Sequence, residues 1–272
     1  QRQMCIRDRL ETVGPFLIGG LRYTGAGVVL LLTLRARGER LPGPRQWPSL
    51  SLLGLLLLGV GNGGIVWAEQ TVPSGLTAVL VAMTPFWMVG IDAVRPGGAR
   101  LTMRRVGGLV VGFLGIVLLV WPELRGGAGP GFMGGVAAVQ IACVGWALGS
   151  NYARTRGADE NVLATAAFQM LFGGLWLLAA GTLHGEWALL TFTTRSAGAV
   201  LYLLVFGAVA GFTAYAYALK HLPMATVSLY AYVNPVIAVA LGTLVMGEPF
   251  SVRMLVAGAI VFGGVAIVQG RA

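Results

Sequence analysis

Residues 61–87 read GNGGIVWAEQTVPSGLTAVLVAMTPFW and hold the pattern on which the fold prediction rests. They join the end of one long apolar run to the next through a turn at Pro73, and they place Pro85 halfway along the second run. A helix needs roughly 20 apolar residues to cross the hydrocarbon core of a bilayer, and runs of that length recur along the chain. The chain is therefore predicted to be an all-α, polytopic membrane helix bundle.

The composition of the whole chain agrees with a membrane location. Of its 272 residues, 56% are apolar and 11% are charged, whereas an ordinary soluble domain carries about 25% charged residues. The net charge of +9 would suggest nucleic acid as the partner of a soluble protein, but here the basic residues lie between apolar runs, as topology signals do. We expect the lipid bilayer, and no nucleic acid, as a partner.

Nine membrane-spanning helices are predicted, separated by short loops that are rich in Gly and Pro. The expected spans are 13–34, 48–68, 72–94, 104–121, 131–152, 161–183, 197–219, 222–246 and 253–269. Twelve of the 19 Lys and Arg residues fall in alternate loops on one side. The positive-inside rule makes that side cytoplasmic and places the C-terminus inside.

A shift of 150 residues relates two parts of the chain without a gap. It aligns Gly61 with Gly211, Ala68 with Ala218, Pro73 with Pro223 and Pro85 with Pro235. The same shift places an equivalent of span 131–152 before residue 1, so we expect a first helix to be missing, nine helices to be present of ten, and the complete protein to have two units of five. An odd number of helices inverts the second unit relative to the first, as in many secondary transporters.

Four stretches carry a resemblance to a known family. They are residues 61–87, GWALGSNYARTR at 145–156, LYAYVNPVIAVALGTLVMGE at 229–248 and RLTMRRVGGLVVGFLGIVLLV at 100–120. The sequence resembles EamA-type members of the drug/metabolite transporter superfamily from about Leu10 to Gln269. The resemblance implies two EamA repeats, here 10–121 without its first helix and 131–270, and transport of amino acids or other small metabolites, often outward.

Prolines in the middle of spans give the first candidates for a substrate site. A helix break frees backbone carbonyls, which lipid tolerates only against protein or a wet cavity. Pro85 lies halfway along its span, and Pro235, preceded by Asn234, lies halfway along the equivalent span. The resemblance implies that these two helices form a cavity wall, and a packing kink that only shapes the bundle is the alternative.

Polar and aromatic residues complete the predicted substrate site. They are Asn62, Trp67, Gln140, Trp146, Tyr215 and Tyr230. Rings supply contact area and amides fix orientation, so such a cavity suits apolar or amphipathic solutes. For the amides the alternative is hydrogen bonding between helices, and for the rings it is anchoring at the membrane interface.

Arg22 is the clearest charge inside a span, and such charges are costly and usually functional. It aligns with the second-helix arginine of the family. Binding of substrate, a structural ion pair and a bond to a backbone carbonyl are all open to it. No acidic residue lies in the middle of a span, so the sequence predicts neither a proton relay nor a sodium site.

Alternating access by the two repeats, moving an uncharged or zwitterionic small-molecule substrate, is the predicted mechanism. A nucleotide-sugar or sugar-phosphate carrier is the near alternative, but it would need several cavity Lys or Arg residues to meet phosphate. A receptor or assembly protein that transports nothing is a second alternative. A bacterial inner-membrane location is expected, because eighteen of the 19 basic residues are arginine, which is typical of GC-rich bacterial genes.

An enzyme is not expected. The sequence shows no catalytic residues, because no carboxylates pair within a helix and His184 and His221 fall in loops on opposite faces. Two cysteines without C-x-x-C spacing give no metal site, and no cofactor is predicted.

Small residues on two spans predict close helix packing. They are Gly108, Gly112 and Gly115 in one span, and Ala257, Gly258, Gly263 and Gly264 in the last. Such faces let helices approach closely, either within one chain or in a homodimer. We expect internal packing and leave a homodimer open.

Overall fold

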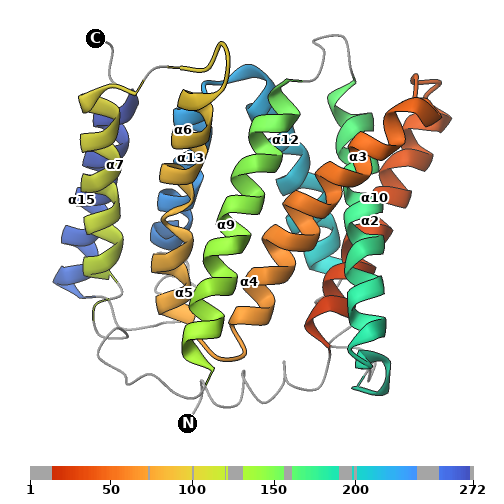
Figure 1. Ribbon diagram of the computed structural model, residues 1–272, viewed down its shortest axis with the longest axis horizontal. Coiled ribbons are helices and arrows are strands. Elements are labelled where there is room, and N and C mark those ends of the chain that lie inside the picture. The colour runs from red at the N-terminus through yellow and green to blue at the C-terminus, as the bar shows by residue number, and fades with distance from the viewer. Residues whose placement is uncertain are drawn as a thin grey trace. The chain divides into compact units, whose positions relative to one another are not determined.

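The computed structural model describes residues 14–72, 74–99, 101–119, 121, 131–155, 161–189, 198, 201–237 and 251–269. Within these residues the regular structure is helical (Figure 1). Six of the described helices are long and apolar enough to cross a membrane: Pro15–Ala36, Pro44–Ala68, Leu76–Val94, Phe132–Arg154, Val162–Leu183 and Leu203–His221. Shorter apolar helices cover Met224–Ile237 and Val252–Val268. The predicted polytopic helical bundle is confirmed.

Each predicted span coincides with helical structure, and most described ends agree within a few residues. Five spans are single helices: α2 (Pro15–Ala36), α7 (Met103–Leu119), α9 (Phe132–Arg154), α10 (Val162–Leu183) and α15 (Val252–Gln269). The other spans are segmented. The second span consists of η1 (Pro44–Gln46), α3 (Trp47–Gly54), η2 (Leu55–Asn62) and α4 (Gly63–Ala68), and the third consists of α5 (Ser74–Val81) and α6 (Thr84–Val94). The seventh contains η4 (Leu203–Phe212) and α12 (Thr213–His221), and the eighth begins with α13 (Met224–Ser228). The described residues leave out Pro73 and residues 238–246 of the predicted spans. They also leave out residues 1–13, so the expectation of a missing first helix stays a prediction.

The described helices form two compact units. Unit 1 comprises Gln1–Trp67 and Tyr152–His221, and unit 2 comprises Ala68–Asn151 and Leu222–Ala272. Each unit takes helices from both predicted repeats. A unit is therefore not a repeat, and helices that the 150-residue shift equates come together inside one unit.

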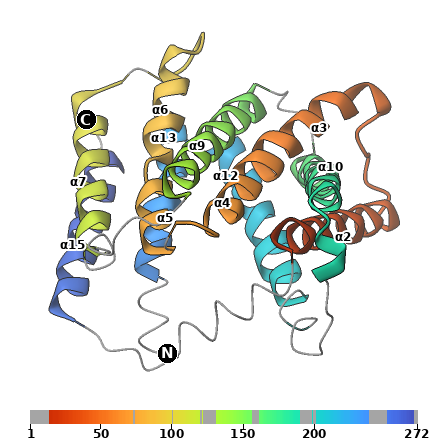
Figure 2. The same cartoon turned by 60° about the horizontal axis from the view of Figure 1, so that its bottom comes forward.

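In unit 1 the equated helices are α2 and α10, which pack along each other (Figure 2). Leu17, near the start of α2, contacts Gly181 near the end of α10. Leu34, near the end of α2, clusters with Ala164 and Ala167 near the start of α10. The two helices are therefore antiparallel, as an inverted repeat requires.

A buried carboxylate closes this antiparallel pair at one end. Glu186 lies in η3 (Glu186–Leu189), just after α10, and is 6% exposed. It accepts the backbone N–H of Leu17 at 2.8 Å and that of Phe16 at 3.4 Å. These N–H groups belong to the first turn of α2, where they have no partner within the helix. The helix dipole also favours a negative charge at this end. Glu186 thus caps α2 from the neighbouring helix.

Two π-helical segments occupy equivalent places in unit 1, and the sequence analysis did not predict them. They are η2 and η4, which end at Asn62 and Phe212, 150 residues apart. Each continues directly into an α-helix, α4 or α12. Regular π turns are rare in proteins and concentrate at functional sites. Their recurrence at one position of the repeat shows that the two halves share local backbone geometry as well as helix order.

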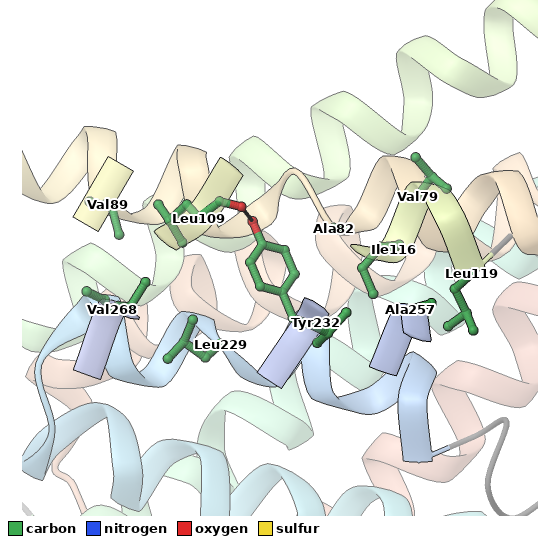
Figure 3. Packing of buried hydrophobic residues seen from close by; sticks show 12 residues of the cluster. Val79, Ala82, Val89, Leu109, Ile116, Leu119, Leu229, Tyr232, Ala257 and Val268 are labelled. Carbon is green, nitrogen blue, oxygen red and sulfur yellow. Dashed lines mark hydrogen bonds between the residues drawn. The ribbon is translucent and has the colours of Figure 1, made fainter. Parts of the chain in front are cut away.

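In unit 2 the equated helices α7 and α15 are also antiparallel. A Cβ atom on Gly108 would lie 2.9 Å from the carbonyl oxygen of Gly264, and one on Gly115 would lie 3.1 Å from that of Ala257. Gly112 lies against Gly264 of α15 and also makes room for the ring of Tyr232, whose hydroxyl donates to the carbonyl of Leu109 at 3.0 Å (Figure 3). The predicted internal packing is confirmed for these small residues.

Two residues of the predicted face in α15 do not take part in this close packing. Nothing lies within 4 Å of a Cβ atom placed on Gly263, and one on Gly258 would make only ordinary van der Waals contact with Val236. The helix turns these positions away from α7, because residues 263 and 264 are about 100° apart around an α-helix. The possible homodimer stays a prediction.

We predict that Gly264→Ala and Gly263→Ala have different effects on stability. A Cβ atom on Gly264 would lie 2.5 Å from the backbone nitrogen of Gly112, so α7 and α15 must move apart. We expect Gly264→Ala to lower the free energy of unfolding by about 1–3 kcal/mol, and Gly263→Ala to leave it unchanged or raise it slightly. Thermal unfolding of the purified protein in detergent measures both; equal effects would contradict the packing.

Candidate functional site

The span that holds Pro85 is interrupted in unit 2. Helix α5 ends at Val81, residues Ala82 and Met83 form a turn, and α6 begins at Thr84. Pro85 is buried in the first turn of α6. Proline has no N–H and its ring clashes with the carbonyl four residues earlier, so it is tolerated where a helix begins. The helix break predicted near the middle of this span is therefore present.

Gln140 of α9 binds the backbone at the interruption. Its Nε2 donates to the carbonyl of Leu80 at 3.4 Å, and its Oε1 accepts the indole N–H of Trp87 at 3.1 Å. Cys143, one turn further along α9, places its Sγ 3.7 Å from the same carbonyl. One amide thus fastens α9 to the segments on both sides of the break.

Asn151 makes a second connection between α9 and α6. It is 3% exposed, and its Nδ2 donates to the carbonyls of Met88 at 3.1 Å and Ala147 at 3.0 Å. Its Oδ1 has no hydrogen-bond partner among the described residues. Both bonds use the amide nitrogen and fix the orientation of the side chain, so Oδ1 is left as an unused acceptor.

The second proline-containing span also has a break, but not at its proline. Helix α13 ends at Ser228, Leu229 forms a turn, and helical structure resumes from Tyr230 to residue 237. Pro235 is half-buried within the resumed helix, and α13 packs against α6 (Figure 1). The carbonyl of Leu229 accepts N–H groups both three and four residues ahead, which tightens this turn. The break therefore precedes Pro235 by about one and a half helical turns.

The rings of Trp146 and Tyr230 approach each other within unit 2. Their centroids are 6.4 Å apart, with 50° between the planes, and both side chains are half-buried. Asn234, one turn beyond Tyr230, is exposed. Of the predicted site residues in unit 2, Gln140 therefore contacts the segments on both sides of the break before Pro85, and Trp146 and Tyr230 contact each other, while Asn234 is exposed.

The remaining predicted site residues belong to unit 1. Asn62 is half-buried at the last position of η2, and Trp67, in α4, is 38% exposed. Tyr215 is half-buried in α12, with its ring 6.3 Å from that of Phe212. Arg22 is half-buried in α2. Asn62 and Tyr215 thus lie at or just after the two π segments.

Three acidic side chains of the described residues make structural contacts: Glu39 with Asn161, Asp92 with Arg95, and Glu186 with the first turn of α2. Asp92, near the end of α6, pairs with Arg95 at 3.1 Å and accepts the backbone N–H of Ala99 at 3.3 Å. The described residues contain no group of three His, Cys, Asp or Glu side chains that could hold a metal ion.

Sequence reasoning missed Trp87, which is 40% exposed beside the break. A usable signal was its position two residues after Pro85, within the first turn of the new helix. Its bond to Gln140 depends on how closely α9 approaches α6, and the local sequence around Trp87 does not predict that contact.

We predict that Gln140 and Trp87 are energetically coupled. Gln140→Leu and Trp87→Phe each remove one partner of the bond, so the double variant should lose less stability than the sum of the two, by about 0.5–1.5 kcal/mol. Thermal unfolding of the four proteins measures the coupling. Trp187→Phe is the control, because its indole donates to Thr182 and its effect should add to that of Gln140→Leu. Additivity of Trp87→Phe as well would contradict the bond.

Comparison with known proteins gives a consistent picture. The family model described as EamA-like transporter family matches residues 4–121 and 133–269. An Escherichia coli (strain K12) protein named "Uncharacterized inner membrane transporter YedA" is 37% identical over 270 residues, which are 98% of this chain and 85% of that protein. A Streptantibioticus cattleyicolor protein named "Probable terminal-alkyne amino-acid exporter" is 26% identical over 273 residues, 98% of this chain and 88% of that protein.

A crystal structure shares the fold. Its TM-score against this chain is 0.78 at 23% sequence identity, and the alignment covers 96% of this chain and 90% of the other.

Proposed function

Because the chain belongs to the EamA-like transporter family, we propose that it is a secondary transporter that exports amino acids or other small uncharged or zwitterionic metabolites by alternating access. Membership of the drug/metabolite transporter superfamily agrees with the resemblance seen in the sequence. The chain is a multi-pass transporter of the inner membrane. The substrate, the direction and the mechanism are the proposed part.

The interrupted span in unit 2 is the observation that supports this proposal most strongly. In secondary transporters, substrate sites are typically built where membrane helices are discontinuous. Here α5 and α6 are separated by Ala82 and Met83, and Gln140 binds the backbone beside the gap. Exposed backbone polar groups at membrane depth require protein or water beside them. A substrate that approaches this turn would meet both polar backbone and aromatic side chains.

The side chains around the break favour a small amphipathic substrate. Trp87 is 40% exposed, and Trp146 and Tyr230 are half-buried, so rings are accessible on α6, on α9 and after α13. The basic residues of unit 2 within the described ranges lie near helix ends: Arg95, Arg104, Arg105 and Arg253. A sugar phosphate would need several cations inside the spans. The described part of unit 2 is thus better suited to a substrate with little net charge.

The comparisons support the same substrate class. One relative, 26% identical, is named a probable exporter of an amino acid. The family and the names of the relatives indicate a transporter rather than an enzyme.

Counterflow in proteoliposomes tests the proposal. The purified protein should exchange at least one radiolabelled amino acid in a panel that also contains sugar phosphates and cationic dyes. Trp146→Ala and Tyr230→Ala should each lower the initial rate about tenfold, which corresponds to about 1.4 kcal/mol, because Trp and Tyr are enriched among the contact residues whose truncation is costly. Trp187→Ala, a ring in a connection between helices, should leave the rate unchanged. Exchange of sugar phosphates without exchange of amino acids would refute the proposed substrate class.

A further inference from the structure

A short basic turn joins two membrane spans of unit 1. The first span ends at Ala36 and the next begins at Pro44, and a connection of this length can extend at most about 12 Å from the helix ends and return. Residues 35–45 contain four arginines and one glutamate, which gives this stretch a net charge of +3. The arginines are all exposed, and they are Arg35, Arg37, Arg40 and Arg45.

Hydrogen bonds fix the backbone of the turn where it leaves α2. Gly38 has a φ of +72°, and the N–H of Glu39 donates to the carbonyl of Leu34 at 3.0 Å, which is the long bond of a Schellman motif. Glu39 then accepts the Nδ2 of Asn161 at 3.0 Å, and Asn161 caps α10 by accepting the N–H of Leu163 at 3.0 Å. The turn is thus attached to the start of the neighbouring helix.

Apolar side chains anchor the rest of the turn between the arginines. Leu41 packs against two apolar clusters, one around Leu34 and one around Leu50. The Trp47 ring lies 5.9 Å from that of Phe168, and its indole N–H donates to the carbonyl of Pro42 at 3.3 Å. Trp47 is nevertheless 44% exposed, as is typical of a tryptophan at the membrane interface. The turn therefore presents its arginines from a fixed scaffold.

The protein does not neutralise the arginines of this turn within the described residues. Other arginines on the side predicted to be cytoplasmic have partners: Arg95 pairs with Asp92 at 3.1 Å, and the Nε of Arg104 donates to the carbonyl of Ile267 at 2.8 Å. The ion pair of Arg95 is the one present in the described ranges, so it leaves the four arginines of the turn unpaired there. Their charge remains for a partner outside the chain.

We propose that residues 35–47 form a binding surface for the headgroups of anionic phospholipids. Clusters of four or more basic residues directly beside a membrane span attract anionic lipids, and the planar fork of a guanidinium matches two phosphate oxygens. Trp47 supplies the apolar contact at the same level of the membrane. The proposal depends on the membrane location of the chain and is independent of what the protein transports.

Quenching by brominated lipids tests the proposal at this position. The full chain is reconstituted in vesicles that contain brominated phosphatidylglycerol or, at the same mole fraction, brominated phosphatidylcholine. The difference in emission between the protein and its Trp47→Phe variant isolates the signal of Trp47. We expect the anionic lipid to quench that signal about threefold more than the neutral lipid does. In 1 M NaCl, where the Debye length is about 3 Å, the preference should shrink.

Arginine variants assign the preference to the turn. Combined replacement of the four arginines by glutamine should make the two lipids quench Trp47 equally, whereas combined replacement by lysine should keep most of the preference. The double variant Arg37→Gln/Arg40→Gln retains two of the arginines as topology signals and should lose about half of it. Arg95→Gln, whose guanidinium is paired with Asp92, should leave it unchanged. Trp187, which is 50% exposed in η3 at the opposite end of the α2–α10 pair, should be quenched equally by both lipids.

Three outcomes would overturn the proposal. Equal quenching of Trp47 in the wild-type protein would show that the turn is neutralised within the chain, for instance by Asp159 and Glu160, which lie outside the described residues. A preference that survives the fourfold glutamine replacement would assign lipid binding to other residues. Relief of quenching by inorganic phosphate, beyond that by NaCl of the same ionic strength, would assign the surface to a soluble phosphate compound.

Discussion

A backbone carbonyl inside a bilayer must find its donor within the protein, since lipid offers none. This constraint governs the part of unit 2 around Pro85. The turn at Ala82 and Met83 interrupts the regular hydrogen bonding of a span: the N–H of Met83 donates to the carbonyl of Leu80, three residues back, and side chains add further donors. The hydroxyl of Thr84 donates to the carbonyl of Val81 at 2.6 Å, and Gln140 donates to that of Leu80. A break near the middle of a span is thus tied to one glutamine on another helix.

Close backbone contact is the second constraint on the fold. Between membrane helices the hydrophobic effect supplies little attraction, so association depends on van der Waals contact at small residues and on hydrogen bonds. Gly108 and Gly264 provide that contact between α7 and α15, as Gly20 and Gly174 do between α2 and α10. In both cases the partners are helices that the sequence repeat equates, and they run antiparallel. Within each unit, helices from equivalent positions of the two inverted repeats therefore pack directly against each other.

The sequence was sufficient for features that depend on composition or on one residue's chemistry. Long apolar runs located the spans, proline predicted an interrupted helix before Pro85, and small residues predicted the seam between α7 and α15. The sequence was insufficient for features whose geometry depends on contact with another helix. The π segments, the turn at Leu229 and the bond between Trp87 and Gln140 each depend on how other helices approach. The sequence also made Asn234, the residue before Pro235, a candidate for the site but did not show that this position is exposed.

The amide of Gln140 reconciles two interpretations that the sequence left as alternatives. Hydrogen bonding between helices and contact with a substrate seemed to compete for one side chain. A glutamine amide, however, has two N–H donors and an oxygen with two lone pairs. The bonds to Leu80 and Trp87 use one donor and one lone pair. Gln140 can therefore hold the broken span in place and still offer a donor and an acceptor to a solute, so a structural role does not remove it from the candidate site.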